Sequence, residues 1–183
     1  MLEPRFAVRS LLAAVAALML AAPASATTLV RRGLDRLTAE NETIVEAKVL
    51  DIHSYWNAAH TFIFTDVHAR PSQTMKGTPA TDVDFTVMGG TVDGTTVLIV
   101  GGPELEPGSD YVLFLGRGGL PGPQERLTVR DLSQGVFVVD HGRAFSQARS
   151  EPLLPDAQGR ADVPGGDDGL ALDTLMRLIH DVR

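Results

Sequence analysis

The feature that most restricts the fold of this chain is a period of two in its apolar residues. Residues 43–54 alternate apolar with charged or polar side chains, so that the apolar ones fall on one face of an extended segment. Residues 61–70 alternate in the same way until Pro71, whose missing amide hydrogen we expect to end the strand. Both segments are predicted to be strands with one buried and one exposed face.

Further segments have the composition of strands: residues 82–88, 95–100, 111–115, 126–131 and 136–140. Turns rich in Gly and Pro separate them. Residues 111–115, with the sequence YVLFL, are apolar throughout, which predicts the most central strand. Six or seven short strands without intervening helices predict an all-β fold, either an antiparallel barrel or a sandwich.

The C-terminal part of the chain changes in character. Residues 150–168 are rich in Pro, Gly and charged side chains, which predicts a flexible linker. Residues 169–183 are predicted to be a C-terminal α-helix, because their apolar residues follow a helical spacing: Leu172, Leu175, Met176 and Ile179. A helix of about 14 residues is marginal alone, so we expect it to dock on its own sheet or on a partner.

The N-terminal 26 residues have the pattern of a signal peptide. Arg5 and Arg9 precede an uncharged apolar run over residues 11–22, and Ala24 and Ala26 fit the small-residue cleavage pattern. The run is shorter than the about 20 residues that a membrane-spanning helix needs. We therefore expect an exported protein, periplasmic or secreted, that does not span the membrane.

Charge and cysteine content limit the partners. The 157 residues after the predicted signal peptide carry a formal net charge of -8, and Lys48 and Lys76 are their only lysines. An acidic chain without clusters of Lys and Arg is a poor ligand for phosphates, so we expect no nucleic acid partner. The chain has no cysteine, which excludes disulfides and thiolate metal sites. Its length suits one domain.

Residues 53–60 are the most distinctive stretch, since they hold the only tryptophan and one of two tyrosines. They lie between two predicted strands, and Asn57 favours the left-handed backbone of tight turns. A hairpin centred near Asn57 would place His53 close to Phe62, with His60 in the loop. The stretch is therefore predicted to be the end of a β-hairpin.

The aromatic residues of this hairpin allow two interpretations. Tyr55 and Trp56 can cap the open end of a barrel, because such side chains usually supply packing area with one polar tip. They can also form an exposed platform for a peptide or a sugar, because tyrosine and tryptophan anchor many interfaces. If this region binds a ligand, we predict that the site residues are His53, Tyr55, Trp56 and His60.

Histidine is the commonest metal ligand, and this chain offers candidates at His53, His60, His68 and His141. They form neither an HExxH motif nor a His-x-His pair, whereas a catalytic zinc site needs three convergent ligands. We therefore predict no metal and no other cofactor.

The only indication of nucleophilic catalysis in the sequence is the presence of suitable residue types near one another. Ser133 is close in sequence to Asp131, Asp140 and His141, which together supply the residue types of a triad. There is no Gly-x-Ser-x-Gly motif. We predict no catalytic residues, and a secreted hydrolase using Ser133, His141 and an aspartate is kept as an alternative.

An ordered set of short motifs over residues 34–140 resembles small exported bacterial β-barrel proteins and, more distantly, the OB-fold of tissue inhibitors of metalloproteinases and netrin-type domains. The motifs are Leu34-x-x-Leu37, residues 44–49 (IVEAKV), 54–56 (SYW), 63–67 (IFTDV), 75–77 (MKG), 89–90 (GG) and 107–115 (PGSDYVLFL). This resemblance implies a small antiparallel OB-like barrel over residues 27–149. Those inhibitors use a disulfide-tied N-terminal cysteine, which this chain lacks, so their mechanism does not transfer.

These observations favour a non-catalytic exported module that binds another exported protein, such as a protease or an envelope component. The expected contact surface is the barrel end with Tyr55, Trp56 and the loop 101–109. A small-ligand or sugar carrier is the other alternative, in which the barrel mouth would be a deep pocket instead of a filled core.

Overall fold

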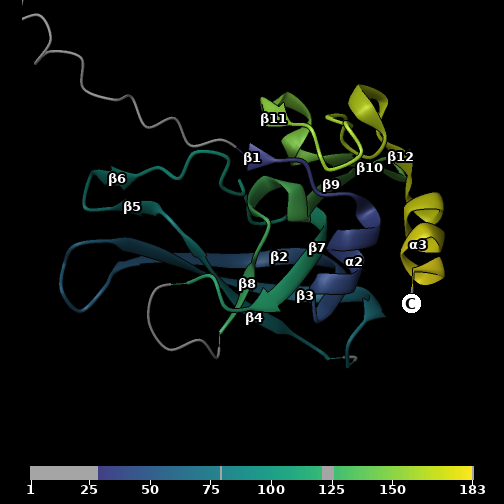
Figure 1. The fold of residues 1–183 in the computed structure, drawn as a ribbon. Coiled ribbons are helices and arrows are strands. Elements are labelled where there is room, and N and C mark those ends of the chain that lie inside the picture. The colour runs from purple at the N-terminus through teal and green to yellow at the C-terminus, as the bar shows by residue number, and fades with distance from the viewer. Residues whose placement is uncertain (1–28, 79, 121–125, 183) are drawn as a thin grey trace, which may run out of the picture.

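A computed structural model of the chain describes residues 29–78, 80–120 and 126–182. Its largest element is one antiparallel sheet of eight strands (Figure 1). The strands are β2 (Thr43–Trp56), β3 (Ile63–Lys76), β4 (Val83–Met88), β7 (Asp110–Arg117), β8 (Leu127–Val129), β9 (Val136–Asp140), β10 (Arg143–Ser146) and β12 (Leu170–Ala171). Their order is β12, β10, β9, β7, β2, β3, β4, and β8 pairs with the end of β7.

Smaller elements lie around this sheet. β1 (Leu29–Val30) and β11 (Leu153–Leu154) form a parallel pair, and β5 (Gly90–Val92) and β6 (Thr95–Val97) form a hairpin. The α-helices are α2 (Leu34–Glu40) and α3 (Leu172–Asp181), and the 3-10 turns are η1 (Leu132–Gly135), η2 (Gln147–Ser150) and η3 (Gly166–Asp168). None of these described helices is long and apolar enough to cross a membrane.

β7 is the central strand of the sheet, as its apolar sequence predicts. It pairs with β2 on one side and with β9 and then β8 on the other. Every residue from Tyr111 to Gly116 is buried. Because side chains alternate along a strand, this continuous apolar run supplies both faces of the sheet.

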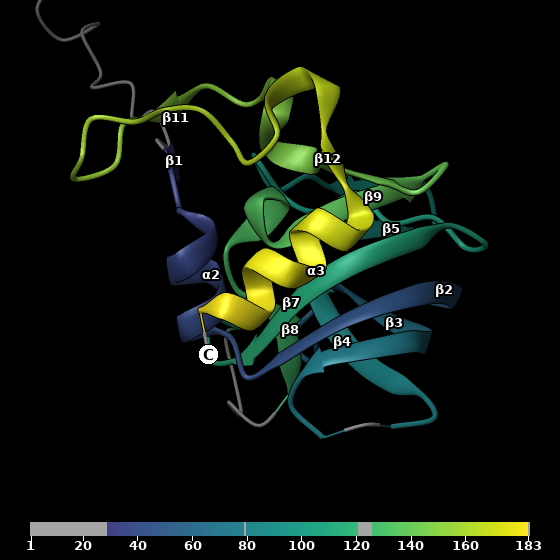
Figure 2. The same cartoon turned by 90° about the vertical axis from the view of Figure 1, so that its right-hand side faces the viewer.

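Each face of the sheet has its own apolar core. The inner core contains Val45, Val67, Phe85, Tyr111, Leu113 and Val136 among other residues. The outer core, on the opposite face, contains Ile44, Val112, Phe114, Phe137, Leu175 and Ile179. Figure 2 shows α2 and α3 on the outer face, with α3 across β7. The C-terminal helix therefore docks on its own sheet.

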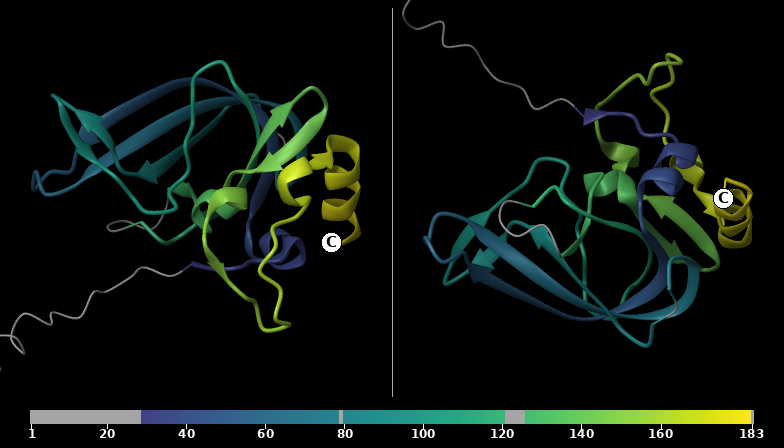
Figure 3. Two further views of the ribbon diagram at one scale, coloured as in Figure 1. Left: turned by 90° about the horizontal axis from the view of Figure 1, so that it is seen from above. Right: turned by 60° about the horizontal axis from the view of Figure 1, so that its bottom comes forward.

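The sheet curves around the inner core but is not a closed barrel (Figure 3). β8 lies beside β4, yet its described ladder bonds go to β7 at residues 115–117. All three residues of β8 pair with β7, and no ladder between β8 and β4 is formed among the described residues. The all-β class, the antiparallel sheet and the C-terminal helix are thus confirmed, whereas barrel closure is wrong.

Two of the expected strands differ in extent. β3 continues through Pro71 to Lys76. β4 pairs with β3 only from Phe64 to Ala69, so Pro71 lies on a free edge and opposite a register shift in β2, where a missing amide hydrogen is tolerated. Residues 95–100 are not one buried strand, because β6 ends at Val97 and the side chains of Leu98 and Val100 are 86% and 66% exposed.

The predicted linker makes defined contacts in the structure. Leu153 and Leu154 pair with β1, and the Arg31 guanidinium lies 2.6 Å from the Asp156 carboxylate. The helix predicted from residue 169 begins at Leu172, because residues 170–171 pair with β10 as β12. Residues 150–168 therefore contain two short elements, β11 and η3, before α3 begins.

Candidate functional site

The β2–β3 hairpin extends beyond the rest of the sheet (Figure 1). A register shift between Val49 and Asp51 places one extra residue, Leu50, in β2. Val49 faces the inner core with its partner Ala69, but Asp51 pairs with His68, which lies on the outer face. The bulge thus turns the odd-numbered residues of β2 from the inner to the outer face.

The predicted site residues separate into two pairs on this hairpin. Tyr55 pairs with Phe64 and Trp56 with Ile63, so the two neighbouring aromatic side chains point to opposite faces. The Tyr55 ring stacks on His53, with centroids 6.2 Å apart and an interplanar angle of 14°. The Trp56 ring stacks on His60 at 6.0 Å and 26°. The four residues do not form a single platform.

The hairpin register also differs from the expected one. His53 pairs with Asp66 and not with Phe62, because the connecting loop runs from residue 57 to residue 62. His60 lies in that loop with a positive φ of 52°. Asn57 closes the loop, since its side-chain oxygen accepts hydrogen bonds from the amides of Thr61 and Phe62 at 2.8 and 3.2 Å.

An aromatic row follows the outer face of the hairpin. It runs from His53 through Tyr55 to Phe64, 6.3 Å from Tyr55, and on to Phe62, 5.2 Å from Phe64. Phe64 is buried, Tyr55 and Phe62 are half-buried, and His53 is exposed. The buried Phe64 therefore anchors a row whose other rings are partly or fully exposed to solvent.

A polar network holds Tyr55 in this row. The Arg126 guanidinium donates to the Tyr55 hydroxyl at 2.6 Å and lies 3.4 Å from an Asp66 carboxylate oxygen. The same Asp66 oxygen accepts from Thr86 at 2.6 Å and from Tyr55 at 3.2 Å. Arg126 directly precedes β8. Its side chain therefore links β8 to β2, β3 and β4, with which β8 forms no ladder among the described residues.

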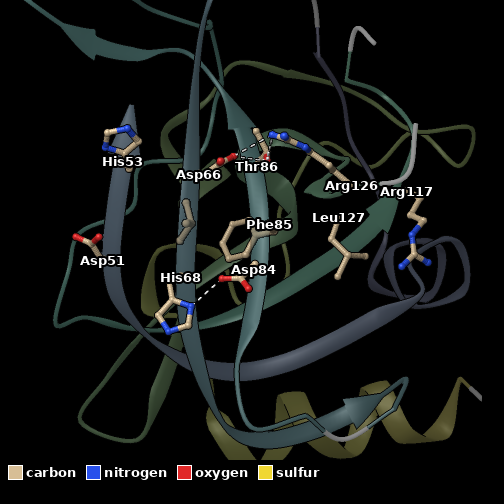
Figure 4. A pocket seen from close by; sticks show the side chains of 11 residues that line it. Asp51, His53, Asp66, His68, Asp84, Phe85, Thr86, Arg117, Arg126 and Leu127 are labelled. Atoms are coloured by element: carbon tan, nitrogen blue, oxygen red, sulfur yellow. Dashed lines mark hydrogen bonds and ion pairs between the residues drawn. The ribbon is translucent and has the colours of Figure 1, made fainter. Parts of the chain in front are cut away.

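Beside this network lies an open hollow of about 440 Å³ over the outer face of β2, β3 and β4. Figure 4 shows ionisable side chains from each strand around it, with the Arg126 guanidinium directed at Thr86 and Asp66. The ionisable lining residues are Asp51, His53, Asp66, His68, Asp84, Arg117 and Arg126. His68 Nδ1 lies 2.7 Å from Asp84, and the two side chains form a cross-strand pair. The hollow thus combines apolar side chains with ionisable groups of both signs of charge.

A metal centre is not formed in the part of the chain that the structure describes. No three histidine, aspartate or glutamate side chains converge there. His68 has Asp84 at 2.7 Å and Asp82 at 3.9 Å, but Asp82 also binds Arg70 at 3.2 Å. Asp84 is thus paired with His68, and Asp82 with Arg70, along the strand edge.

The components of the alternative hydrolase site do not meet. Ser133 is 2% exposed, and its hydroxyl has no hydrogen-bond partner among the described residues. The His141 side chain is 91% exposed at a turn, where Asp140 at 2.7 Å raises the pKa of its imidazole through a hydrogen bond. Asp131 lies 3.4 Å from Arg32. A serine without a base is not an activated nucleophile.

Sequence reasoning missed three residues of the outer-face site: Asp66, Thr86 and Arg126. Asp66 and Thr86 follow from the strand register once the bulge at Leu50 is known. Arg126 is distant in sequence from Tyr55, and nothing in its local sequence marks it.

The fold and site define the class of this protein as an all-β protein, with a curved antiparallel sheet, a helix-covered outer face and a protruding aromatic hairpin. Comparison with protein-family models, curated proteins and solved structures finds no match. The resemblance to metalloproteinase inhibitors and netrin-type domains, including the OB-fold, stays a prediction.

Proposed function

We propose that this chain is an exported, non-catalytic module that binds another exported protein through the outer face of its β2–β3 hairpin. The observation that carries the proposal is the half-buried Tyr55 ring, which stacks on His53, contacts the tilted ring of Phe64 and is held by hydrogen bonds with Arg126 and Asp66. Tyrosine, arginine and tryptophan are the residue types that most often carry binding energy in interfaces. A ring that is fixed before binding loses little conformational entropy in a complex.

The side chains around Tyr55 are also arranged as in a protein–protein interface. A protein contact usually places an aromatic centre inside a rim of polar and charged groups. Here the aromatic row adjoins the hollow, and Asp51 and His53 are exposed at its edge. Asp66 pairs with Arg126 and Asp84 with His68, whereas the exposed Asp51 carboxylate favours a partner segment with an arginine or lysine side chain. A protease or an envelope component with such a segment fits this description.

The choice of a binding role over catalysis rests on the separation of the candidate catalytic residues. Ser133 is buried within η1, whereas His141 is exposed at the turn between β9 and β10. The export part of the proposal rests on residues 1–26 alone, which lie outside the described residues. The absence of a metal and of a cofactor stays a prediction.

Two matched alanine variants test the proposed surface. Tyr55→Ala removes the outer-face ring, and Trp56→Ala removes its sequence neighbour on the opposite face. Wild-type and variant chains would be used to capture a partner from periplasmic extract, and the affinity of the captured protein would then be measured. We expect Tyr55→Ala to weaken binding by about 30-fold or more, as removal of an interface hot spot does, with a small effect of Trp56→Ala.

Thermal unfolding of both variants is the control for folding. Equal affinities of Tyr55→Ala and the wild type would exclude this surface. Equal weakening by both variants would show that partner binding depends on the hairpin as a whole and would also contradict the proposal.

A further inference from the structure

The inner face of the same strands carries a second hollow of about 390 Å³. Its lining residues are Ile52, Ser54, Thr65, Val67, Val87, Met88, Gly89, Gly90, Thr91, Pro103 and Leu105. None of these described lining residues has an ionisable side chain, whereas charged residues surround the outer hollow. The loop 101–109 contributes here, on the face opposite Tyr55.

A pair of hydroxyl groups lies at the base of this hollow. The Thr65 hydroxyl donates to the Gly89 carbonyl oxygen at 2.8 Å. A hydroxyl has one hydrogen, so in the 2.8 Å bond between Ser54 and Thr65 the donor must be Ser54. The hydrogen of Ser54 is thereby used within the protein, and the free capacity of its oxygen is as an acceptor. A ligand that reaches Ser54 must bring an O–H or N–H donor.

The backbone of β5 fixes these hydroxyls in place. A Cβ atom on Gly90 would lie 2.3 Å from the Thr65 hydroxyl oxygen and 2.5 Å from that of Ser54. Gly90 also has a φ of +131°, which side-chain-bearing residues rarely adopt. Glycine at this position therefore lets the start of β5 lie close beside the pair without displacing it.

Part of the wall of the hollow is aliphatic. Val67 and Val87 belong to the inner core, and Leu105 packs against it. Ile52 at the rim is 37% exposed, so part of its hydrocarbon remains in water. Covering such a surface with a ligand removes apolar area from water, which is favourable.

We infer that this hollow binds a small uncharged amphiphile, with a hydroxyl or amide N–H donor directed at Ser54 and hydrocarbon against Ile52 and Leu105. A volume of about 390 Å³ lies within the usual range of ligand pockets, about 300–1,000 Å³. A charged ligand is disfavoured because the hollow offers no opposite charge to offset the loss of hydration. The site is independent of the proposed protein-binding surface, since the two lie on opposite faces of β2 and β3.

Two probes with the same hydrocarbon chain test the inference. Octyl glucoside has a neutral head with hydroxyl donors, and octanoate has a carboxylate without a donor. Both would be titrated, below the micelle concentration, into the ¹⁵N-labelled mature chain. We expect saturable amide shifts with octyl glucoside, centred on β2, β3 and residues 87–91, and at least about tenfold weaker binding of octanoate.

Variants on the two faces distinguish this site from the outer surface. Ser54→Ala should weaken octyl glucoside binding by about 2- to 10-fold, as loss of one hydrogen bond does. Ile52→Glu should weaken it as well, and this exposed rim position tests the site if Ser54→Ala lowers stability. Tyr55→Ala should leave the affinity unchanged. Absence of saturable binding or equal binding of octanoate would overturn the inference. An octyl glucoside affinity that neither Ser54→Ala nor Ile52→Glu changes would also overturn it.

Discussion

The central strand and the protruding hairpin use the same kind of backbone for opposite purposes. In β7 every residue from Tyr111 to Gly116 is buried, because the inner and outer cores cover both faces. In β2 none of the residues from Asp51 to Trp56 is buried. Both strands belong to one sheet. The comparison shows that stability is concentrated around β7, while the hairpin is left free to present side chains.

One extra residue, Leu50, separates the buried part of β2 from its exposed part. Before Leu50 the odd-numbered residues face the inner core, and after it they face outward. The outer face thereby receives Asp51, His53 and Tyr55, and the inner face receives Ile52 and Ser54. Without the bulge, charged and histidine side chains would be directed toward the inner side of the sheet. The bulge is therefore the local cause of the contrast between the two hollows.

Deletion of Leu50 should have the largest effect, because it removes that cause. The strand must then invert one of its two segments, which either turns Asp51 and His53 inward or exposes Val45 and Val49. We expect a loss of about 4 kcal/mol or more in the free energy of unfolding, enough to prevent folding of a marginally stable domain.

Circular dichroism and urea unfolding measure this effect. Deletion of Ala58, an exposed loop residue, is the matched control and should give a folded protein. A Leu50 deletion variant as stable as the Ala58 deletion variant would show that the bulge does not set the register.

Phe114→Ala tests the covered region and should have the second largest effect. Phe114 is fully buried in the outer core, with its ring centroid 5.8 Å from that of Phe137. Its truncation should destabilise the protein by about 3–5 kcal/mol, whereas Ile52→Ala on the hairpin should cost about 1 kcal/mol or less. Urea unfolding of both variants gives the comparison, and similar losses would contradict the assignment of stability to the region around β7.

Much of this architecture can be read from the sequence. Alternation predicts β2 and β3, the run YVLFL predicts the central strand, and the spacing of Leu172, Leu175 and Ile179 predicts the docked helix. The apolar pattern also gave a wrong prediction at one segment, where apolar composition does not correspond to burial. The run 95–100 is apolar, but Leu98 and Val100 are exposed because the β5–β6 hairpin ends at Val97.

The site was less predictable than the fold. The sequence indicates Tyr55 and His53, since aromatic residues in a turn region are rare in this chain, but alternation alone cannot say that Trp56 faces away from them until the register is known. A bulge has no reliable sequence signal, and it decides every orientation that follows it. Arg126 reaches Tyr55 only through the curvature of the sheet, so no local pattern could assign it.

The smallest expected effect concerns the β1–β11 ribbon. The test asks whether this ribbon unfolds together with the covered part of the sheet or separately from it. Asp156 links the chain after β11 to Arg31, which directly follows β1. Its carboxylate accepts hydrogen bonds from the backbone amides of Arg160 and Gln158, both at 2.9 Å, and pairs with the guanidinium groups of Arg31 and Arg160. These donors, the Arg160 amide first, lower the pKa of Asp156 from 3.8 to about 2.

A carboxyl group whose pKa is lower in the folded state stabilises that state above its unfolded pKa, and this contribution is lost as the pH falls. For Asp156 the loss should therefore occur between about pH 4 and pH 2. We expect the methyl resonances of Val30 and Leu154 to change in that interval while those of Val112 and Leu175 in the outer core stay native. In Asp156→Asn the ribbon resonances should show no transition in this interval. Simultaneous change of the ribbon and the outer core would instead place β1 and β11 in the same cooperative unit as β7.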